Sequence, residues 1–187
     1  MKTLFTSLII AFCFIGCAQD VPSREWQLKT AVLALPEANQ ADATVLGYGS
    51  DGELTTLRQG KNEFICLADD PKQEGFSVAA YQKGLDPFMA RGRELRKQGK
   101  NNGEIFDIRE EEVKSGKLSM PDKSTLYIAT GKVDEAGEVQ ELKVRYVVYI
   151  PFATPESTGL SPAPIGPGAP WIMNPGTHRA HIMITPE

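Results

Sequence analysis

Among residues 24–187, one cysteine and two histidines have side chains suited to covalent chemistry or metal binding: Cys66, His178 and His181. A cysteine acts as a nucleophile when a neighbouring base activates it, and these two histidines are the only ones in the chain. One hypothesis is therefore a thiol-dependent enzyme, a hydrolase or a redox protein, in which Cys66 works with His181. The alternative is a packed thiol. Cys66 follows Phe64 and Ile65 in a strand-like run, and unpaired cysteines are among the most buried residues, so the packed thiol is favoured.

The spacing of His178 and His181 disfavours a shared metal. Residues three apart lie on one face of a helix but point to opposite sides of a strand. The run Ile182-Met183-Ile184 after His181 favours a strand. We expect no metal site and no cofactor, and we expect His181 to be a partly buried, hydrogen-bonded residue.

Two charged segments follow each other in the middle of the chain. Residues 91–100 contain five basic side chains, which could bind an anion or a membrane surface. Glu104, Asp107 and Glu111 follow at helical spacing, where paired carboxylates could perform acid–base chemistry. Pairing between the basic segment and the acidic helix explains both segments without a ligand, and this interpretation is favoured.

The composition excludes several classes of protein. The chain has 187 residues, a net charge of −4, 41% hydrophobic and 24% charged residues, which is typical of a globular domain and not of a disordered chain. A mildly acidic charge gives no electrostatic attraction to nucleic acid, so we expect no nucleic-acid partner. Phosphate-binding loops, dinucleotide fingerprints and nucleophile elbows are absent from the sequence.

The first residues have the pattern of an export signal. Lys2 precedes the apolar stretch 4–15, which is too short, at roughly 18 Å as a helix, to cross a hydrocarbon core of about 30 Å. The run Phe14-Ile15-Gly16-Cys17-Ala18 resembles a bacterial lipoprotein signal. The resemblance implies a signal peptide over 1–16, a lipid on Cys17 and a tether over 17–23. A plain secretory signal that is cleaved nearby is the alternative.

The lipoprotein resemblance also implies a location. We expect a protein of the bacterial cell envelope that is anchored to the membrane through its N-terminal lipid. Ala18 after Cys17 fits the outer membrane in such lipoproteins, with the domain facing the periplasm. Cys13 leaves with the signal and Cys17 carries lipid, so Cys66 has no partner for a disulfide within the chain.

The remaining residues, 24–187, predict a single α+β domain. Helices are expected from Ser23 to Leu35, over 86–98 and over 104–114, and strands over 44–48, 54–58, 63–67, 125–130, 141–150 and 179–185. The strand over 141–150 has the clearest alternation, and its apolar face is expected to meet the core: Leu142, Val144, Tyr146, Val148 and Ile150. We expect a mainly antiparallel sheet with two or three helices packed on one face.

A proline-rich loop over 151–175 stands out from the rest of the domain. It holds seven of the thirteen prolines and is too long for an ordinary connection. Functional residues concentrate on such loops, so Phe152 and Trp171 are the candidate apolar anchors of a binding surface.

Several scattered segments resemble an uncharacterised group of secreted bacterial proteins. The main one is Leu57-Arg58-Gln59-Gly60-Lys61-Asn62-Glu63-Phe64-Ile65-Cys66-Leu67, which contains the Leu-Arg-x-Gly-x-Asn core and the cysteine of that group. Others are the turn Asp69-Asp70-Pro71, the stretch Pro151-Phe152-Ala153-Thr154, and Pro175 followed by His181-Ile182-Met183. The resemblance implies no activity.

Together these patterns predict an envelope lipoprotein that binds a small ligand or a partner protein of the envelope and is not an enzyme. The thiol-dependent enzyme that uses Cys66 with His181 is the competing hypothesis.

Overall fold

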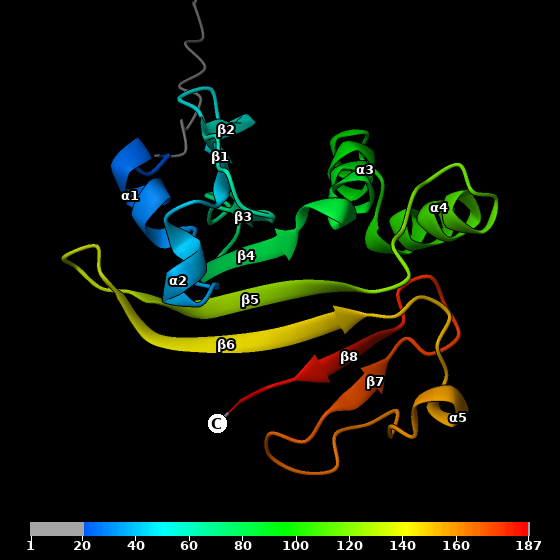
Figure 1. Cartoon of the computed structure of the whole chain (residues 1–187). Coiled ribbons are helices and arrows are strands. Elements are labelled where there is room, and N and C mark those ends of the chain that lie inside the picture. The colour runs from blue at the N-terminus through cyan, green and yellow to red at the C-terminus, as the bar shows by residue number, and fades with distance from the viewer. Residues whose placement is uncertain (1–20, 187) are drawn as a thin grey trace, which may run out of the picture.

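A twisted eight-stranded sheet runs through the computed structural model, which describes residues 21–186 (Figure 1). The helices are α1 (Arg24–Thr30), α2 (Glu37–Gln40), the 3-10 turn η1 (Lys83–Leu85), α3 (Asp86–Lys97), α4 (Asn102–Lys114) and α5 (Pro155–Thr158). The strands are β1 (Thr44–Tyr48), β2 (Leu54–Arg58), β3 (Phe64–Leu67), β4 (Phe76–Gln82), β5 (Ser124–Val133), β6 (Val139–Tyr149), β7 (Trp171–Met173) and β8 (His181–Ile184).

The sheet is mixed, because one pair of neighbouring strands is parallel. The strand order is β2-β1-β3-β4-β5-β6-β8-β7, and β1 and β3 run parallel while the other described pairs are antiparallel. The chain leaves β2 at the edge of the sheet and crosses to the other side of β1. A short turn in the sequence usually joins antiparallel neighbours, so the sequence did not reveal this crossing.

The segment that resembles the secreted bacterial group is the connection that makes this crossing. The guanidinium of Arg58 donates to the carbonyls of Gln40 and Ala43. Asn62 donates from its amide to the carbonyl of Asn39. A Cβ on Gly60 would lie 2.2–2.3 Å from the backbone of residues 42–44, so only glycine allows this close approach. The motif therefore has a structural role that accounts for its residues.

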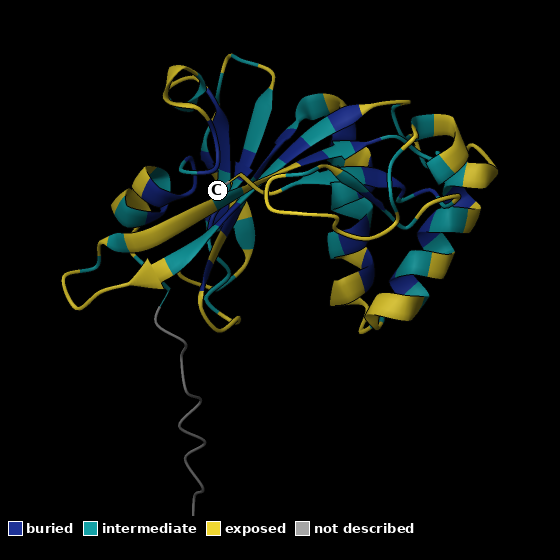
Figure 2. Cartoon of the chain, turned by 90° about the horizontal axis from the view of Figure 1, so that it is seen from below, coloured by how far each residue is buried: buried dark blue, intermediate teal, exposed yellow. Residues whose placement is uncertain are grey.

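The expected fold class, a mainly antiparallel sheet with two or three helices on one face, is wrong: the sheet is mixed, strands predominate over helices, and helices cover both faces. The part of the chain that the structure describes holds five helices, three of them seven residues or longer. Paired residues Val78 and Ala129 belong to the core under α1, whereas the adjacent pair Ala79 and Ile128 faces α3. Successive residues of a strand point to opposite faces. The central strands β4 and β5 therefore have an apolar side chain on each face, and both faces need a cover. Figure 2 shows these central strands as the buried part of the molecule.

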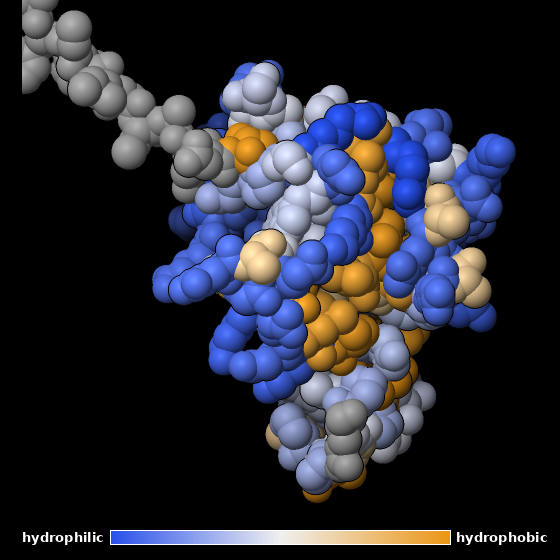
Figure 3. Space-filling view, turned by 90° about the vertical axis from the view of Figure 1, so that its left-hand side faces the viewer, coloured by the Kyte–Doolittle hydropathy of each residue, from blue (hydrophilic) through white to orange (hydrophobic). Residues whose placement is uncertain are grey.

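The face of β6 that is buried is the opposite of the one predicted to meet the core. Val147 and Tyr149 are buried, whereas Leu142 and Tyr146 are 40% and 38% exposed. The buried residues of the core under α1 come from the turn after α1, β1 to β5 and nearby loops, whereas β6 contributes only the partly buried Val139 and Val144. The core therefore covers this face of β6 incompletely. Apolar residues reach the surface as a band on the side of the molecule that Figure 3 shows.

The two longer helices form as the sequence predicts, and they pack together. α4 begins with a capping box, in which the side chain of Asn101 accepts from the backbone of Glu104 and the carboxylate of Glu104 accepts in return. Arg91 of α3 donates twice to the carboxylate of Glu112 on α4, at 2.7 and 2.9 Å. Pairing between the basic and acidic segments is thus confirmed for Arg91.

A central strand was missed, because its sequence signal is weak. β4 contains Ala79 and Ala80 at its centre, and alanine has a low strand propensity. The strand nevertheless lies in the middle of the sheet, between β3 and β5.

Candidate functional site

The face of the sheet under α3 and α4 is wider than this helix pair. Eight strands span about 34 Å at about 4.8 Å per spacing, whereas two packed helices cover about 20 Å. The flanks of this face are consequently open. One flank lies over β6, β8 and β7, and the other lies over β2, β1 and β3.

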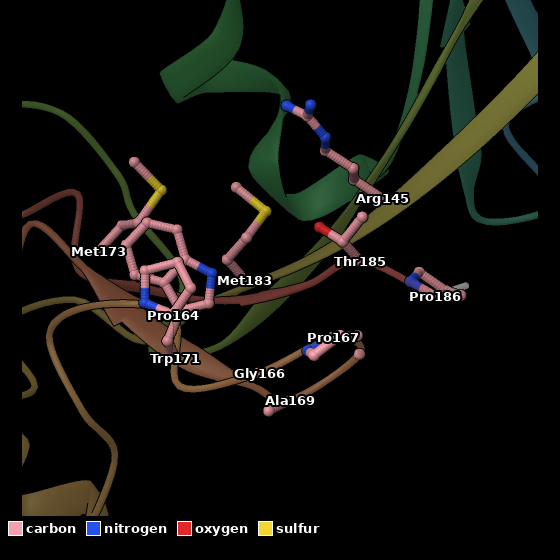
Figure 4. A pocket seen from close by; sticks show the side chains of 11 residues that line it. Arg145, Pro164, Gly166, Pro167, Ala169, Trp171, Met173, Met183, Thr185 and Pro186 are labelled. Atoms are coloured by element: carbon pink, nitrogen blue, oxygen red, sulfur yellow. The ribbon is translucent and has the colours of Figure 1, made fainter.

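The first flank carries the Trp171 groove, an open cavity of about 520 Å³. Its walls are an indole, two thioethers, prolines and an arginine: Trp171, Met173, Met183, Pro164, Pro167 and Arg145. Trp171 lies opposite Met183 in the β7–β8 pair, and the loop 164–169 forms the far wall (Figure 4). Ile172 points to the other side of β7 and is fully buried. β7 thus anchors the groove through Ile172 and leaves Trp171 partly exposed.

Arg145 is the cation of the Trp171 groove. It lies on the same face of β6 as Val147, and its side chain is exposed. No described carboxylate forms an ion pair with its guanidinium. The groove therefore combines a large apolar wall with one positive charge that the described residues do not neutralise.

Phe152, the other predicted anchor, is not part of the groove. Its backbone N–H donates to the carbonyl of Thr177 at 2.7 Å, beyond the end of β8 that lies away from Trp171. The residue is 40% exposed and has a positive φ of 64°, which is uncommon for a residue with a side chain. The structure therefore separates the two anchors that the sequence grouped in one loop.

Cys66 and His181 do not meet. Cys66 lies in β3 on the face covered by α1, and His181 lies in β8 on the opposite face, next to Tyr149. Four strand spacings separate their strands, about 19 Å. Cys66 is fully buried, and burial raises the pKa of its thiol to about 12. A thiol in this environment is protonated and inaccessible at neutral pH.

Both histidines are buried and uncharged at neutral pH. Burial lowers the pKa of His181, whose Nδ1 hydrogen-bonds the carbonyl of Arg179 at 2.7 Å. Burial also lowers the pKa of His178, which lies between the rings of Phe88 and Phe106. Its Nδ1 is 3.2 Å from a carboxylate oxygen of Glu110, while its Nε2 has no described partner. The expectation for His181, a buried and hydrogen-bonded residue, is confirmed.

The second flank carries the charged cleft, two adjoining cavities of about 560 and 190 Å³. The two cavities share five lining residues: Tyr48, Leu54, Asp70, Arg93 and Arg96. Asp69 lines the smaller cavity as well. Burial, together with the adjacent carboxylate of Asp70, raises the pKa of Tyr48 to about 12. Burial also raises the pKa of Asp69. The cleft thus brings carboxylates and guanidinium groups together from separate parts of the chain.

Residues 21–186 contain no arrangement that suggests a metal centre or a membrane-spanning helix. No group of three or more histidine, cysteine or carboxylate side chains in this range could hold a metal ion. None of the helices in the same range is long and apolar enough to cross a bilayer. The predicted signal peptide and the predicted lipid on Cys17 lie outside the described residues.

Comparison with protein-family models, with curated proteins and with solved structures found no match for the chain.

The sequence indicated one of the groove residues and missed the others. Trp171 stood out as an aromatic residue in a proline-rich loop. Arg145, Met173 and Met183 come from strands, and only the pairing of β6, β8 and β7 places them together. The one available signal was the alternation of β6, which puts Arg145 on the same face as Val147 and Tyr149.

Proposed function

We propose that this protein is a non-enzymatic binding domain of the bacterial cell envelope that holds an elongated apolar molecule with an acidic group in the Trp171 groove. The observation that carries the proposal is the combination of an open apolar wall with Arg145, whose guanidinium forms no ion pair with a carboxylate of residues 21–186. Binding pockets typically pair a largely apolar lining with a few polar groups that fix the orientation of the ligand.

The chemistry of the walls supports this class of ligand. Methionine side chains adapt to irregular apolar shapes, and an indole offers a large flat surface. Trp171, Met173 and Met183 suit a hydrocarbon chain in this way. A guanidinium forms strong charge-assisted hydrogen bonds to carboxylate and phosphate groups, which suits Arg145 to an acidic end group.

The experiment that tests the proposal is a fluorescence titration with decanoate and with decanol. Decanoate is expected to change the emission of Trp171, and decanol is expected to bind more weakly. By isothermal titration, which does not use the indole as a reporter, Trp171→Ala is expected to weaken decanoate binding at least about tenfold. The same substitution should cost roughly 1–2 kcal/mol of stability, because the indole is partly exposed.

Arg145→Gln separates the two parts of the proposed ligand. It should weaken decanoate about tenfold and leave decanol unchanged, since it removes the charge and keeps most of the side-chain length. Lys143→Gln, an exposed change two residues away on the same face of β6, is the matched control. Equal loss of stability and binding in Trp171→Ala would instead make the indole a core residue and would overturn the proposal.

The envelope location is part of the proposal and has its own test. It is supported by the run Phe14-Ile15-Gly16-Cys17-Ala18. Mass spectrometry of the protein from its native membranes is expected to find Cys17 as the first residue, with attached acyl chains. An intact N-terminus on protein from the cytosol would contradict both the signal peptide and the lipid anchor.

A further inference from the structure

The charged cleft contains opposite charges that the fold holds apart. On one wall, Asp69 and Asp70 belong to the turn after β3. On the other wall, Arg93 and Arg96 belong to α3. No ion pair joins the two walls among the described residues through these four side chains. The facing charges of the two walls therefore remain unpaired with each other and can interact with a ligand that carries both charges.

The carboxylates are oriented by neutral donors and not by cations. Asp69 accepts from the backbone N–H of Ser77 at 2.8 Å. Asp70 accepts from the backbone of Lys72 and the amide of Gln73, both at 3.0 Å. These bonds hold the two carboxylates in place, but they leave the negative charge of this wall without a cation.

The guanidinium groups present the complementary charge. Arg93 forms an ion pair with Asp86 and a hydrogen bond to the hydroxyl of Tyr81, both at 3.2 Å, so its position is fixed and its charge is partly compensated. Arg96 is exposed, and its polar contact in the described structure is a long one, 3.4 Å to the amide oxygen of Asn102. Arg96 thus keeps most of its donors available to a ligand.

The floor of the cleft is apolar, and its mouth is bridged. Leu46 and Leu54 line the larger cavity, next to the ring of Tyr48. At the rim, Lys97 of α3 forms an ion pair with Glu53 of the β1–β2 hairpin. The cavity of about 560 Å³ lies within the range of small-molecule sites.

We propose that the charged cleft binds a small zwitterion of the amino-acid or short-peptide class, with its ammonium toward Asp69 and Asp70 and its carboxylate toward Arg93 and Arg96. A simple cation would meet the arginines, and a simple anion would meet the carboxylates. A molecule that carries both charges satisfies both walls, and an apolar side chain on it would lie over the leucines of the floor.

The test is an amide-shift titration by NMR with four probes: leucine, the dipeptide Leu-Leu, N-acetyl-leucine and leucine methyl ester. Leucine or Leu-Leu is expected to shift the amides of the cleft with a Kd of about 1 mM or tighter. The acetylated and esterified probes, which each lack one charge, should bind at least about tenfold more weakly. If leucine binds more tightly than Leu-Leu, the ligand is a free amino acid, and if Leu-Leu binds more tightly, the ligand is a short peptide.

Two substitutions assign the charges. Asp70→Asn should remove the preference for leucine over N-acetyl-leucine, while Arg96→Gln should remove the preference for leucine over its methyl ester. Asp122→Asn and Lys143→Gln, exposed changes outside the cleft, are the matched controls and should bind leucine as the wild type does.

Equal binding of the four probes, or the absence of any shift at the cleft, would overturn the proposal. These outcomes do not depend on the folding of a variant, because the probes are compared on the unaltered protein. Decanoate binding in the same samples tests the Trp171 groove separately, so the failure of one proposal is distinguishable from the failure of the other.

Discussion

The two flanks of one sheet face have the same origin but opposite chemistry. Each exists because α3 and α4 cover the middle of the face and not its edges. The Trp171 groove is built from strands and prolines, with one cation on an apolar wall. The charged cleft is built from a hairpin, a turn and a helix, with carboxylates facing guanidinium groups. The comparison shows that a flank takes its chemistry from the elements at its edge, whereas the helix pair determines only that a flank exists.

The largest effect is expected from removing the support that the two flanks share. Phe88 of α3 is 1% exposed and packs against Tyr149 of β6. Phe88→Ala should lower the free energy of unfolding by about 3–5 kcal/mol and should weaken ligand binding at both flanks. Urea unfolding measures the first effect, and the two titrations above measure the second. Gln98→Ala, an exposed change just after the same helix, should have an effect below about 0.5 kcal/mol. Loss of binding at one flank only would show that the flanks have separate supports.

Salt should separate the two flanks more sharply than any substitution. Raising the ionic strength from about 0.01 M to about 1 M shortens the Debye length from about 30 Å to about 3 Å. Leucine binding at the charged cleft should weaken roughly tenfold. Decanoate binding should change less than about threefold, because salt strengthens the burial of apolar surface while it screens Arg145. Isothermal titration at both salt concentrations measures this difference, and equal salt dependence would contradict the contrast.

Acid should destabilise the part of the domain that carries the Trp171 groove before it destabilises the part that carries the charged cleft. Burial lowers the pKa of His178 and His181 below the ordinary value of 6.5. Below that value the unfolded chain binds protons that the folded chain does not, so the free energy of unfolding falls as the pH drops below about 6.5. Urea unfolding at pH 7 and pH 5 should show this loss, and a variant with His178→Gln and His181→Gln should show less of it. Amide exchange should rise first over 176–184. A uniform rise that includes β1 and β3 would argue against a local origin.

The smallest effect is expected at Cys66, which belongs to neither flank. Its buried thiol has a pKa of about 12, so a thiol reagent at neutral pH should label it only as fast as the domain unfolds. Labelling in the native state and in urea, followed by mass spectrometry, measures this. Rapid labelling of the native protein would instead support the hypothesis of a thiol-dependent enzyme and would argue against a function based on the two flanks.

Local signals in the sequence were enough for several elements. The pair Asp86-Pro87 begins α3, as the sequence indicates, and α4 covers the helix predicted over 104–114 but begins two residues earlier, at Asn102. The pair Asp51-Gly52 lies in the turn between β1 and β2, and Gly52 has the positive φ of 73° that such a turn requires. These features depend on a few neighbouring residues, and for that reason a sequence reveals them.

Other features depended on distant residues, and the sequence misjudged them. The alternation of β6 was recognised, but the face that meets the core was reversed, because both faces carry apolar residues and the position of the helices decides which are covered. Phe152 and Trp171 were grouped as one surface because they share a loop, yet the pairing of β7 with β8 places them apart.

The sequence by itself determined the positions of α3 and α4, the approximate strand positions apart from β4 and β7, and the unpaired state of Cys66 within 21–186. It predicted a helix from Ser23 to Leu35, whereas α1 ends at Thr30, and it did not predict α2 or α5. Tertiary structure alone decided the parallel pairing of β1 with β3, the covering of both sheet faces, and the placement of Arg145 and Trp171 in one groove and of Asp70 and Arg96 in one cleft. The physical reason is the range of the forces involved. Capping and turn preferences act within a few residues, whereas burial depends on which surfaces, far apart along the chain, come to share the same core.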